Sequence, residues 1–460
     1  MTVTLVVPAT MAGELAEVAS REVETAGVLL ARTVTAENGD LRLLARDIHW
    51  VTDEAYLRRE ASSLVIESFG YVPALSAAES TGTVPIWLHT HPGKSSTPRP
   101  SLHDEIVDKE LSDLFRLRSG SDLYGSAIFS QSNGRVLFTG HVESSDQRRA
   151  IDRLWMVGRW LALEKNWLHE SKEFSRSFER NIRAFGGAIQ EILSGLRVGI
   201  VGCGGTGSAV AEQLVRLGVR QFVLVDPDSL SESNLTRVYG AYALDIGRFK
   251  VSIAAEHLRR VAPDVDVLAV SSLVTAESTA KKLLSTDIIF GCTDDNAGRL
   301  VLSRMASYLL TPVIDCGVVL TSSENGRLEG IYGRVTVLVP GAACLVCRDR
   351  IDLRRAASEA LSEDERSRLV HEGYAPALVG VEPAVVVYTT QVAAAAVGEL
   401  LERLIHYGPQ PVPSELLLRV HERELSTNDQ EPGVGHYCHP NSRKLGLGLT
   451  EPFLEQVWKA

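Results

Sequence analysis

The chain has 460 residues, of which 45% are hydrophobic and 23% charged, and its formal net charge is −11. This composition is typical of a globular protein, and a prior of roughly 150 residues per domain predicts two or three domains. The acidic balance argues against nucleic acid as a partner, because neutralising phosphates requires a basic face. The first residues do not resemble a secretory signal, and no uncharged apolar run is long enough to cross a membrane. We therefore expect a cytoplasmic protein with no membrane partner.

Residues 1–145 alternate between segments typical of strands and helices, and they include two histidines separated by one residue. His89 and His91 lie on a predicted strand, where residues i and i+2 share a face roughly 7 Å apart and can bind one ion. Asp104 begins a predicted helix and can complete a two-histidine, one-carboxylate set, whereas His103 is not expected to join it. A zinc ion held this way lowers the pKa of a bound water from ~16 towards ~7.

A general base is also expected near such a zinc ion. Glu24 starts an apolar strand in the stretch Glu-Thr-Ala-Gly-Val-Leu-Leu. Together with His-x-His-Pro at 89–92 and Ser101-x-x-Asp104, it resembles the JAMM/MPN+ metalloprotease family. The resemblance covers residues 1–145, although the loop at 93–100 is slightly longer than the family's.

This first resemblance implies an α/β domain that hydrolyses the amide or isopeptide bond after the C-terminus of a ubiquitin-like protein. Glu24 would be the general acid/base, and Ser101 would stabilise the oxyanion. The catalytic zinc would be held by His89, His91 and Asp104. Two other interpretations remain. In one, the histidines are surface residues whose hydrogen bonds are satisfied without a metal. In the other, the domain is a catalytically inactive MPN scaffold.

Residues 146–194 combine apolar residues at helical spacing with many charges, which predicts one or two connecting helices. From Arg197 the pattern becomes strand, glycine turn, helix and strand, and this alternation predicts a mostly parallel, Rossmann-like sheet wrapped by helices. The turn Gly-Cys-Gly-Gly-Thr-Gly at 202–207 follows a strand and opens a helix, and Asp226 ends the next strand. Such a turn binds phosphates through backbone N–H groups, while the acid binds a ribose hydroxyl.

The residues after the turn argue against a dehydrogenase. Hydride transfer needs no cations here, whereas expelling pyrophosphate requires cations on the phosphates and an acid for Mg²⁺. The motifs Asp-Pro-Asp at 226–228, Ser-Asn-Leu-Thr-Arg at 233–237, Asp-Ile-Gly-Arg-Phe-Lys at 245–250 and Cys-Thr-Asp-Asp-Asn at 292–296 supply both. With these motifs, residues 176 to about 425 resemble the ThiF/MoeB/HesA family. Members of this family are relatives of the ubiquitin-activating enzymes.

This second resemblance implies that the chain adenylates the terminal glycine of a ubiquitin-like or sulfur-carrier protein with ATP and Mg²⁺. Residues expected to bind the nucleotide and Mg²⁺ are Gly202, Gly204, Gly205, Gly207, Asp226, Asp228 and Asp294. Residues expected to stabilise the α-phosphate are Asn234, Arg237 and Lys250. Arg180 would reach into a partner's ATP site, which implies a homodimer, and Asp295 is expected to cap a helix.

The six cysteines do not form a disulfide framework in a reducing compartment. Cys344-x-x-Cys347 resembles half of the ThiF family's structural zinc site. Cys438 and His436, with His439 as an alternative to His436, would complete a Cys₃His set. The competing interpretation is a pair of buried thiols beside a loose tail.

The crossover segment at 349–383 contains no cysteine, which excludes a thioester there. We expect Cys203, in the glycine turn, to act as a small apolar residue of the core. Cys292 and Cys316 are expected to do the same at the ends of buried strands. Cys316 remains the alternative nucleophile. The acyl-adenylate would then be captured by a sulfur donor or by the cysteine of a conjugating enzyme.

The sequence thus predicts an α/β protein with four parts: a JAMM/MPN+ domain (1–145), a helical connector (146–194), a ThiF-type adenylation domain (195–425) and a tail that completes a zinc site (426–460). The favoured function is a bifunctional enzyme that hydrolyses the bond after a ubiquitin-like C-terminus and adenylates the carboxylate. One alternative is adenylation of a peptide or small-molecule carboxylate in a biosynthetic pathway. The other is a non-catalytic MPN docking module.

Overall fold

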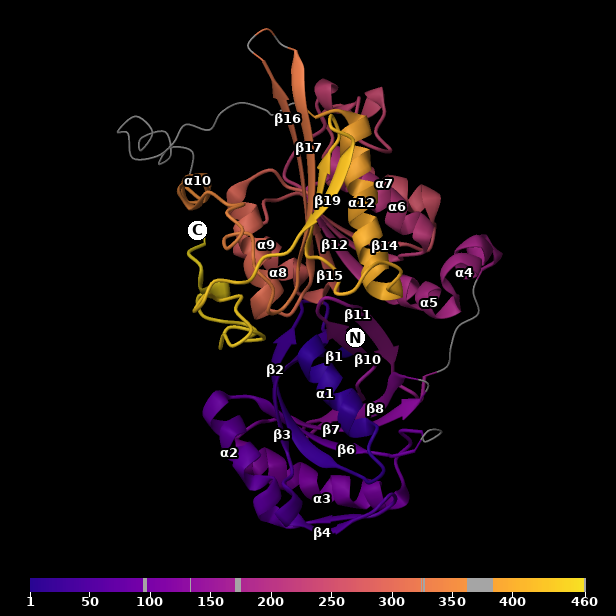
Figure 1. Cartoon of the computed structure of the whole chain (residues 1–460), viewed down its shortest axis with the longest axis vertical. Coiled ribbons are helices and arrows are strands. Elements are labelled where there is room, and N and C mark those ends of the chain that lie inside the picture. Colours follow the sequence, from indigo (N-terminus) through magenta and orange to yellow (C-terminus); the bar gives the residue numbers. More distant parts are fainter. Residues whose placement is uncertain are drawn as a thin grey trace. The chain divides into compact units, whose positions relative to one another are not determined.

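The computed structural model describes residues 1–93, 97–132, 134–169, 175–323, 325, 327–361 and 384–458 (Figure 1). The chain divides into two compact units. The N-terminal unit comprises Met1–Lys172 with Gly446–Leu449, and the C-terminal unit comprises Glu173–Leu445 with Thr450–Ala460. Among the described residues, we find no helix with both the length and the apolar character needed to cross a bilayer.

The N-terminal unit is built on a nine-stranded sheet with the order β11-β10-β1-β3-β2-β6-β7-β8-β9. Its strands are β1 (Val3–Pro8), β2 (Ala26–Thr35), β3 (Leu41–Trp50), β6 (Val84–Thr90), β7 (Tyr124–Ser132), β8 (Arg135–Glu143), β9 (Arg148–Ala150), β10 (Arg153–Val157) and β11 (Leu161–Lys165). A separate small hairpin is formed by β4 (Tyr56–Arg59) and β5 (Leu64–Ile66).

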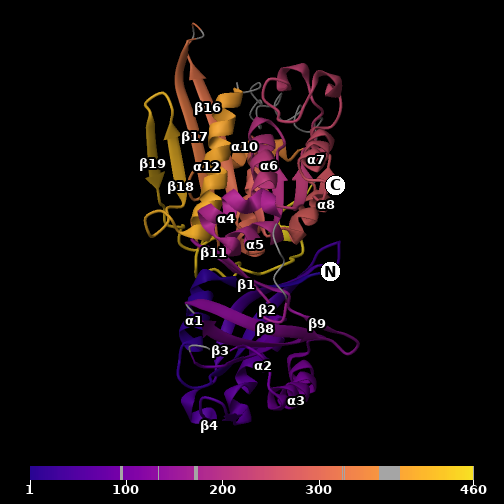
Figure 2. The same ribbon diagram turned by 90° about the vertical axis from the view of Figure 1, so that its right-hand side faces the viewer.

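Helices cover both faces of this sheet. Leu15 of α1 (Ala9–Ala19) packs in one core cluster with Leu43 and Phe138. On the other face, Leu75 of α2 (Val72–Thr81) and Phe115 of α3 (Leu102–Ser119) pack in a second cluster. Figure 2 shows α2 and α3 together on that side. The α/β class predicted for this part is confirmed.

The helical connector predicted from residue 146 is wrong over its first part. Residues 148–165 form β9, β10 and β11, and β10 pairs in parallel with β1 while β11 pairs antiparallel with β10. Leu154 and Trp155 are fully buried there. A short apolar run that is buried on both faces lacks the alternation of an ordinary strand, and its periodicity does not distinguish it from a buried helix. The helices η3 (Arg176–Phe178), α4 (Glu179–Phe185) and α5 (Gly187–Gly195) follow later.

The C-terminal unit has an eight-stranded sheet with the order β14-β13-β12-β15-β16-β17-β18-β19. Its strands are β12 (Arg197–Val201), β13 (Gln221–Val225), β14 (Asp266–Val270), β15 (Ile288–Gly291), β16 (Val313–Ser322), β17 (Leu328–Leu338), β18 (Glu415–Arg419) and β19 (Glu424–Asn428). The strands from β14 to β16 pair in parallel, and those from β16 to β19 pair antiparallel. The sheet is therefore mixed, with the predicted parallel arrangement in one half.

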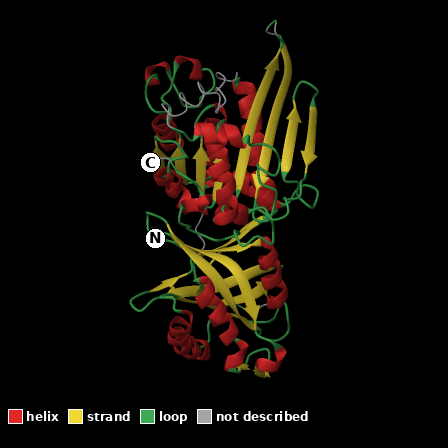
Figure 3. Cartoon of the chain, turned by 90° about the vertical axis from the view of Figure 1, so that its left-hand side faces the viewer, coloured by secondary structure: helices red, strands yellow, loops and turns green. Residues whose placement is uncertain are grey.

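Helices lie on both faces of this second sheet as well. Figure 1 shows α6 (Gly205–Leu217), α7 (Lys250–Val261) and α12 (Val386–Ile405) on one side and α8 (Glu277–Lys282) and α9 (Asn296–Tyr308) on the other. Helix α10 (Leu353–Glu359) packs on α9. Beyond the end of β15, β16 and β17 continue as a long antiparallel pair (Figure 3).

Candidate active sites

The first candidate site lies in the N-terminal unit, where β6 ends and α3 begins. β6 carries His89, and His91 follows its last residue. Ser101 caps α3, because its Oγ accepts from the N–H of Asp104 (3.2 Å) while the Ser101 N–H donates to Oδ2 of Asp104 (2.7 Å). The cap holds Asp104 so that its Oδ1 lies 3.3 Å from Nε2 of His89 and its Oδ2 lies 3.6 Å from Nε2 of His91.

The three predicted ligands therefore meet in one place. One ligand atom from each of His89, His91 and Asp104 lies within 4.8 Å of the others. Burial would raise the pKa of Asp104, but hydrogen bonds with both histidines hold it well below its usual range. Both ring nitrogens of His89 are buried, Nε2 faces Asp104, and Nδ1 makes no hydrogen bond to a described residue. An ionised carboxylate beside two imidazoles is a donor set that can hold one divalent metal ion.

Glu24 and Ser101 line the same cavity as these ligands. The cavity has a volume of about 890 Å³, and its wall includes Glu24, His89, His91, Ser101 and Asp104. Burial raises the pKa of Glu24, and the two nearby histidines oppose the increase. A carboxyl group with a raised pKa is suited to exchanging a proton near neutral pH. His103 also lines the cavity but lies outside the ligand set, as predicted.

The second candidate site is the glycine turn of the C-terminal unit. Gly202 follows β12 with φ +91°, and α6 begins at Gly205 with Gly204 as its N-cap. A Cβ at position 207 would lie 1.8 Å from the carbonyl oxygen of Gly202, and one at position 202 would lie 2.5 Å from the carbonyl oxygen of Cys292. The turn therefore requires glycine at both positions. The N-terminal N–H groups of α6 remain available to an anion.

Two acids organise the strand beside this turn. Asp226 is buried after β13, and its two carboxylate oxygens accept from the N–H groups of Cys203 (2.6 Å) and Asp228 (2.8 Å). Burial raises the pKa of Asp226. Asp228 is mostly exposed, and its Oδ2 lies 2.7 Å from Nζ of Lys250, at the start of α7. Asp226 thus holds the turn in place, while Asp228 and Lys250 face one another beside it.

The other predicted nucleotide residues lie around the same edge of the sheet. The side chain of Arg237 approaches to 3.2 Å from where a Cβ at Gly205 would be. Asn234 is buried in a short helix, and its Oδ1 accepts from the N–H of Ser231 (3.3 Å). Asp294 is exposed in the loop after β15. Asp295 caps α9 by accepting from the N–H of Gly298, which confirms its predicted role.

Arg180 does not join these residues within its own chain. It lies on α4, which begins directly after Phe178, and the ring of Phe178 packs against Gly218 at the C-terminal end of α6. The glycine turn is at the opposite end of this 13-residue helix, about 20 Å away. A function for Arg180 at a glycine turn therefore requires a second chain.

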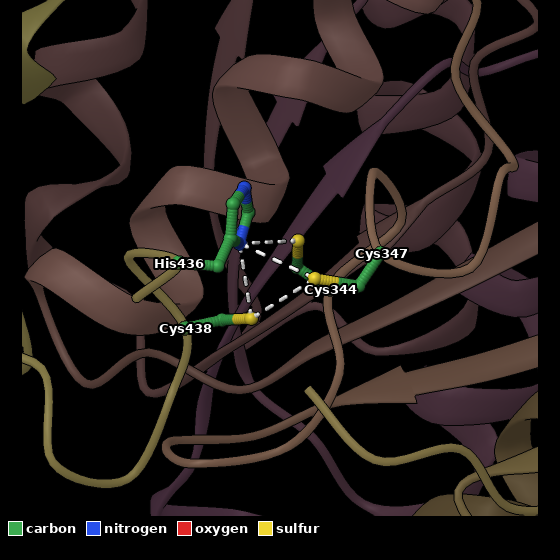
Figure 4. Close-up of side chains that lie close together, drawn as sticks. All are labelled: Cys344, Cys347, His436 and Cys438. Carbon is green, nitrogen blue, oxygen red and sulfur yellow. Dashed lines mark hydrogen bonds between the residues drawn. The ribbon is translucent and has the colours of Figure 1, made fainter. Parts of the chain in front are cut away.

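A third cluster joins two segments of the C-terminal unit that are far apart in sequence (Figure 4). Nδ1 of His436 lies 3.5, 3.3 and 3.2 Å from the Sγ atoms of Cys344, Cys347 and Cys438, respectively. The hydrogen bond with Cys438 lowers the pKa of Cys344 to about 4. The alternative ligand His439 instead accepts from the N–H of Asn441 through its Nδ1 (3.2 Å). The arrangement is a Cys₃His set with His436.

Of the remaining cysteines, Cys203 and Cys316 are buried and Cys292 is half-buried. Burial raises the pKa of Cys203, and a hydrogen bond with Cys316 together with burial raises that of Cys292. Protonated thiols of this kind are poor nucleophiles. Cys316 lies inside β16 and not at its end, so that detail of the prediction is wrong, because β16 extends beyond its parallel neighbour.

Two charged clusters were missed by the sequence analysis. In the N-terminal unit, Asp108 lies 3.1 Å from Nε2 of His141 and accepts from the hydroxyl of Tyr124 (2.8 Å). Its position one helical turn after Asp104 was an available signal. In the C-terminal unit, Asp315 lies between Arg299 and Arg334. These three residues come from different elements, and no local pattern connects them.

The sheet, glycine turn and helices of the C-terminal unit together define a Rossmann-like α/β unit. The sequence model of the ThiF family matches residues 178–431, which is more than half of the chain, so the chain belongs to the ThiF family.

Several curated relatives match parts of the chain. A SAMP-activating enzyme E1 of Haloferax volcanii is 28% identical over 151 residues, covering 33% of this chain and 52% of the relative. A molybdopterin-synthase adenylyltransferase of Escherichia coli is 30% identical over 172 residues, covering 37% and 65%. A sulfur carrier protein ThiS adenylyltransferase of the same species is 30% identical over 151 residues, covering 33% and 56%. The chain thus spans between about half and two thirds of these relatives.

Solved structures of Escherichia coli MccB are also similar. One has 18% sequence identity and a TM-score of 0.46, and the match covers 60% of this chain and 76% of MccB.

The close contacts of the glycine turn generate a stability prediction. Gly207→Ala places a methyl group against the carbonyl of Gly202, and overpacking of this kind destabilises by about 1–3 kcal/mol. Gly204→Ala is the matched control, because no atom lies within 4 Å of its Cβ position and its φ is negative. Thermal unfolding should show a lower melting temperature for Gly207→Ala only. Equal melting temperatures for the two variants would contradict the observed geometry.

Proposed function

We propose that the C-terminal unit adenylates the terminal carboxylate of a ubiquitin-like or sulfur-carrier protein, using ATP and Mg²⁺. The observation that carries this proposal is the gathering of the glycine turn, Lys250, Arg237 and Asp294 at one edge of the sheet in a member of the ThiF family. The names of the relatives describe activation of SAMP and adenylation of ThiS, which supports a protein carboxylate as the substrate.

Each side chain then has a distinct role in the reaction. The N–H groups at the start of α6 bind phosphate oxygens, while Lys250 and Arg237 stabilise negative charge on the α-phosphate. A carboxylate oxygen of the substrate attacks the α-phosphorus, and pyrophosphate leaves. Asp228 keeps Lys250 in position through their 2.7 Å contact. Asp294 would hold Mg²⁺, which neutralises charge on the phosphates when bound.

The active form in this proposal is a homodimer. Arg180 lies at the far end of α6 from its own glycine turn, so it would act in the site of a second copy. Such an arginine would add a third cation to Lys250 and Arg237.

The acyl-adenylate would be transferred to an acceptor outside this chain. The crossover segment 349–383 has no cysteine, and part of it (362–383) lies outside the described residues. The thiols of Cys203 and Cys292 have raised pKa values and are unsuited to attack. A sulfur donor or the cysteine of a conjugating enzyme fits this requirement.

We further propose that the N-terminal unit is a zinc hydrolase of the JAMM/MPN+ type, a second function favoured by the convergence of Glu24, His89, His91, Ser101 and Asp104 on one cavity. The two histidines and Asp104 would hold zinc, which makes hydroxide available near neutral pH. Glu24 would carry the proton from the water to the leaving amine. The Ser101 Oγ accepts the helix N–H, so its own hydrogen is free to stabilise an oxyanion.

The Cys₃His cluster would hold a second, structural zinc. Four ligands fill a tetrahedral shell and leave no position for water, which is the pattern of structural zinc sites. Zinc here would join the Cys344–Cys347 segment to the chain near residue 436.

Competing functions make different predictions. Adenylation of a peptide or small-molecule carboxylate predicts that a ubiquitin-like protein will not support the reaction. A docking role for the N-terminal unit predicts no metal in its cavity and no effect of Glu24 on cleavage.

The adenylation proposal predicts ATP–pyrophosphate exchange that depends on a ubiquitin-like protein ending in Gly-Gly. Lys250→Ala should lower the exchange rate by about 100-fold, because it removes a cation that stabilises the transition state. Lys281→Ala is the control, since Lys281 pairs with Glu277 on α8. Absence of exchange with every Gly-Gly protein encoded in the same genome would reject the proposal.

The metal proposal predicts that the purified protein binds about two zinc ions per chain. Replacing His89 and Asp104 by alanine, or Cys344 and Cys438 by serine, should each leave about one, as measured by elemental analysis. The cysteine variant should also have a lower melting temperature, since structural zinc contributes folding free energy. Zinc retained in full by either variant would exclude the corresponding site.

The hydrolase proposal predicts that Glu24→Gln loses cleavage and keeps zinc. A fusion of a Gly-Gly-ended ubiquitin-like protein to a C-terminal reporter is the substrate. The rate should fall by about 10²–10⁴-fold, the usual contribution of a general base. Glu22→Gln, two residues away and exposed, should cleave normally. Unchanged cleavage by Glu24→Gln would support the docking interpretation of this unit.

A further inference from the structure

Three charged side chains meet on β16, β17 and α9 of the C-terminal unit. Oδ2 of Asp315 lies 2.7 Å from a terminal nitrogen of Arg334, and its Oδ1 lies 3.4 Å from Nε of Arg299. The Asp315 side chain is 1% exposed, and those of Arg299 and Arg334 are 16% and 17% exposed. One carboxylate thus faces two guanidinium groups, and the cluster has a net charge of +1.

Both guanidinium groups also lie over a position that has no side chain. Gly317 pairs with Arg334 across the two strands. A Cβ on Gly317 would lie 3.4 Å from a terminal nitrogen of Arg334 and 3.7 Å from one of Arg299. The Nε atoms of both arginines are buried. That of Arg334 makes no hydrogen bond to a described residue, whereas that of Arg299 faces Asp315. The cluster therefore has an excess positive charge beside a position that has no side chain.

This point adjoins the proposed nucleotide site. Asp315 pairs with Gly291, the last residue of β15, and the loop that carries Asp294 follows directly. Arg299 lies in the first turns of α9, whose cap is Asp295. Beyond Asp315, β16 and β17 run past the end of β15 (Figure 3). A chain that reached the α-phosphate along this strand pair would pass the two arginines.

We propose that Arg299 and Arg334 form a specificity subsite for an acidic side chain in the tail of the protein that is adenylated. The inference rests on the proposed adenylation function and identifies a class of substrate for it. Guanidinium groups bind carboxylates through paired hydrogen bonds, and two of them around one bound carboxylate would leave the cluster neutral together with Asp315.

A purely structural role explains the cluster less well. One arginine is sufficient to neutralise Asp315, and Arg334 already does so at 2.7 Å. A second, mostly buried arginine adds a desolvated charge that is unfavourable without an anion. Binding of a substrate carboxylate supplies that anion.

The test uses the full-length chain and synthetic peptides that end in Gly-Gly. One peptide series places a glutamate at successive positions before the Gly-Gly, and the matched series has glutamine there. Fluorescence anisotropy in the presence of Mg²⁺ and a non-hydrolysable ATP analogue measures peptide affinity. We expect glutamate at one position to bind about tenfold more tightly than glutamine, which is the effect of one charge-assisted pair.

Two variants separate the subsite from the stability of the fold. Arg299→Gln leaves the Asp315–Arg334 pair intact and removes the excess charge, and Gly317→Val keeps every charge but fills the space over the guanidinium groups. Both should lose the preference for glutamate while the binding of the ATP analogue is unchanged. Arg354→Gln, an exposed arginine of α10, is the charge-matched control and should keep the preference.

The outcomes distinguish this inference from the adenylation proposal. Equal affinity for the two peptide series, absence of binding by both, or an undiminished preference in Arg299→Gln and Gly317→Val would each overturn the subsite. Pyrophosphate exchange measured with a Gly-Gly-ended ubiquitin-like protein that carries the same tail tests the chemistry independently. A preference for glutamate without exchange would retain the subsite and reject adenylation, and exchange without a preference would do the reverse.

Discussion

The C-terminal unit depends on the close approach of three backbone segments at the ends of its parallel strands. Gly207 stands against the carbonyl of Gly202, and Gly202 stands against the carbonyl of Cys292, so there is no space for a Cβ in either contact. Asp226 connects this turn to the next strand through the N–H of Cys203. Because the turn, the acid and the loop after β15 are fixed to one another, cations on neighbouring elements can be directed to a single phosphate position.

In the N-terminal unit, one local structure both starts a helix and completes a proposed metal site. The reciprocal hydrogen bonds of Ser101 and Asp104 cap α3, and the same carboxylate faces His89 and His91. The first turn of α3 therefore holds the Asp104 carboxylate in a fixed position. A carboxylate on a loop would lose conformational entropy when the metal binds. Asp104 has already lost this entropy on folding, because the cap orders it.

The features predicted from the sequence share a local origin. The glycine spacing, the His-x-His pair and the helix cap at Asp295 each depend on residues close in the chain, and the structure places each of them as expected. The strands at 148–165 were predicted as helices because β10, the strand that joins them to the sheet, pairs with β1, which is far away in the sequence. The arginines around Asp315 gave no signal because their proximity depends on strand register and on a helix packed against the sheet. Sequence patterns thus identify chemistry that lies within one element, and they miss chemistry assembled between elements.

The two proposed activities are linked by their chemistry. Hydrolysis of an amide after a ubiquitin-like C-terminus creates a free carboxylate, and adenylation consumes a free carboxylate. Because both sites are on one polypeptide, the effective concentration of the hydrolysed tail at the adenylation site is raised. This effect needs no new contact between the units. The proposed arginine subsite adds a condition to this scheme, because an acidic residue near the end of the tail would be present in both reactions. Selection at the adenylation step would then restrict which hydrolysed tails are activated. The specificity of the whole protein would depend on one cluster with a single excess positive charge, in a chain whose net charge is −11.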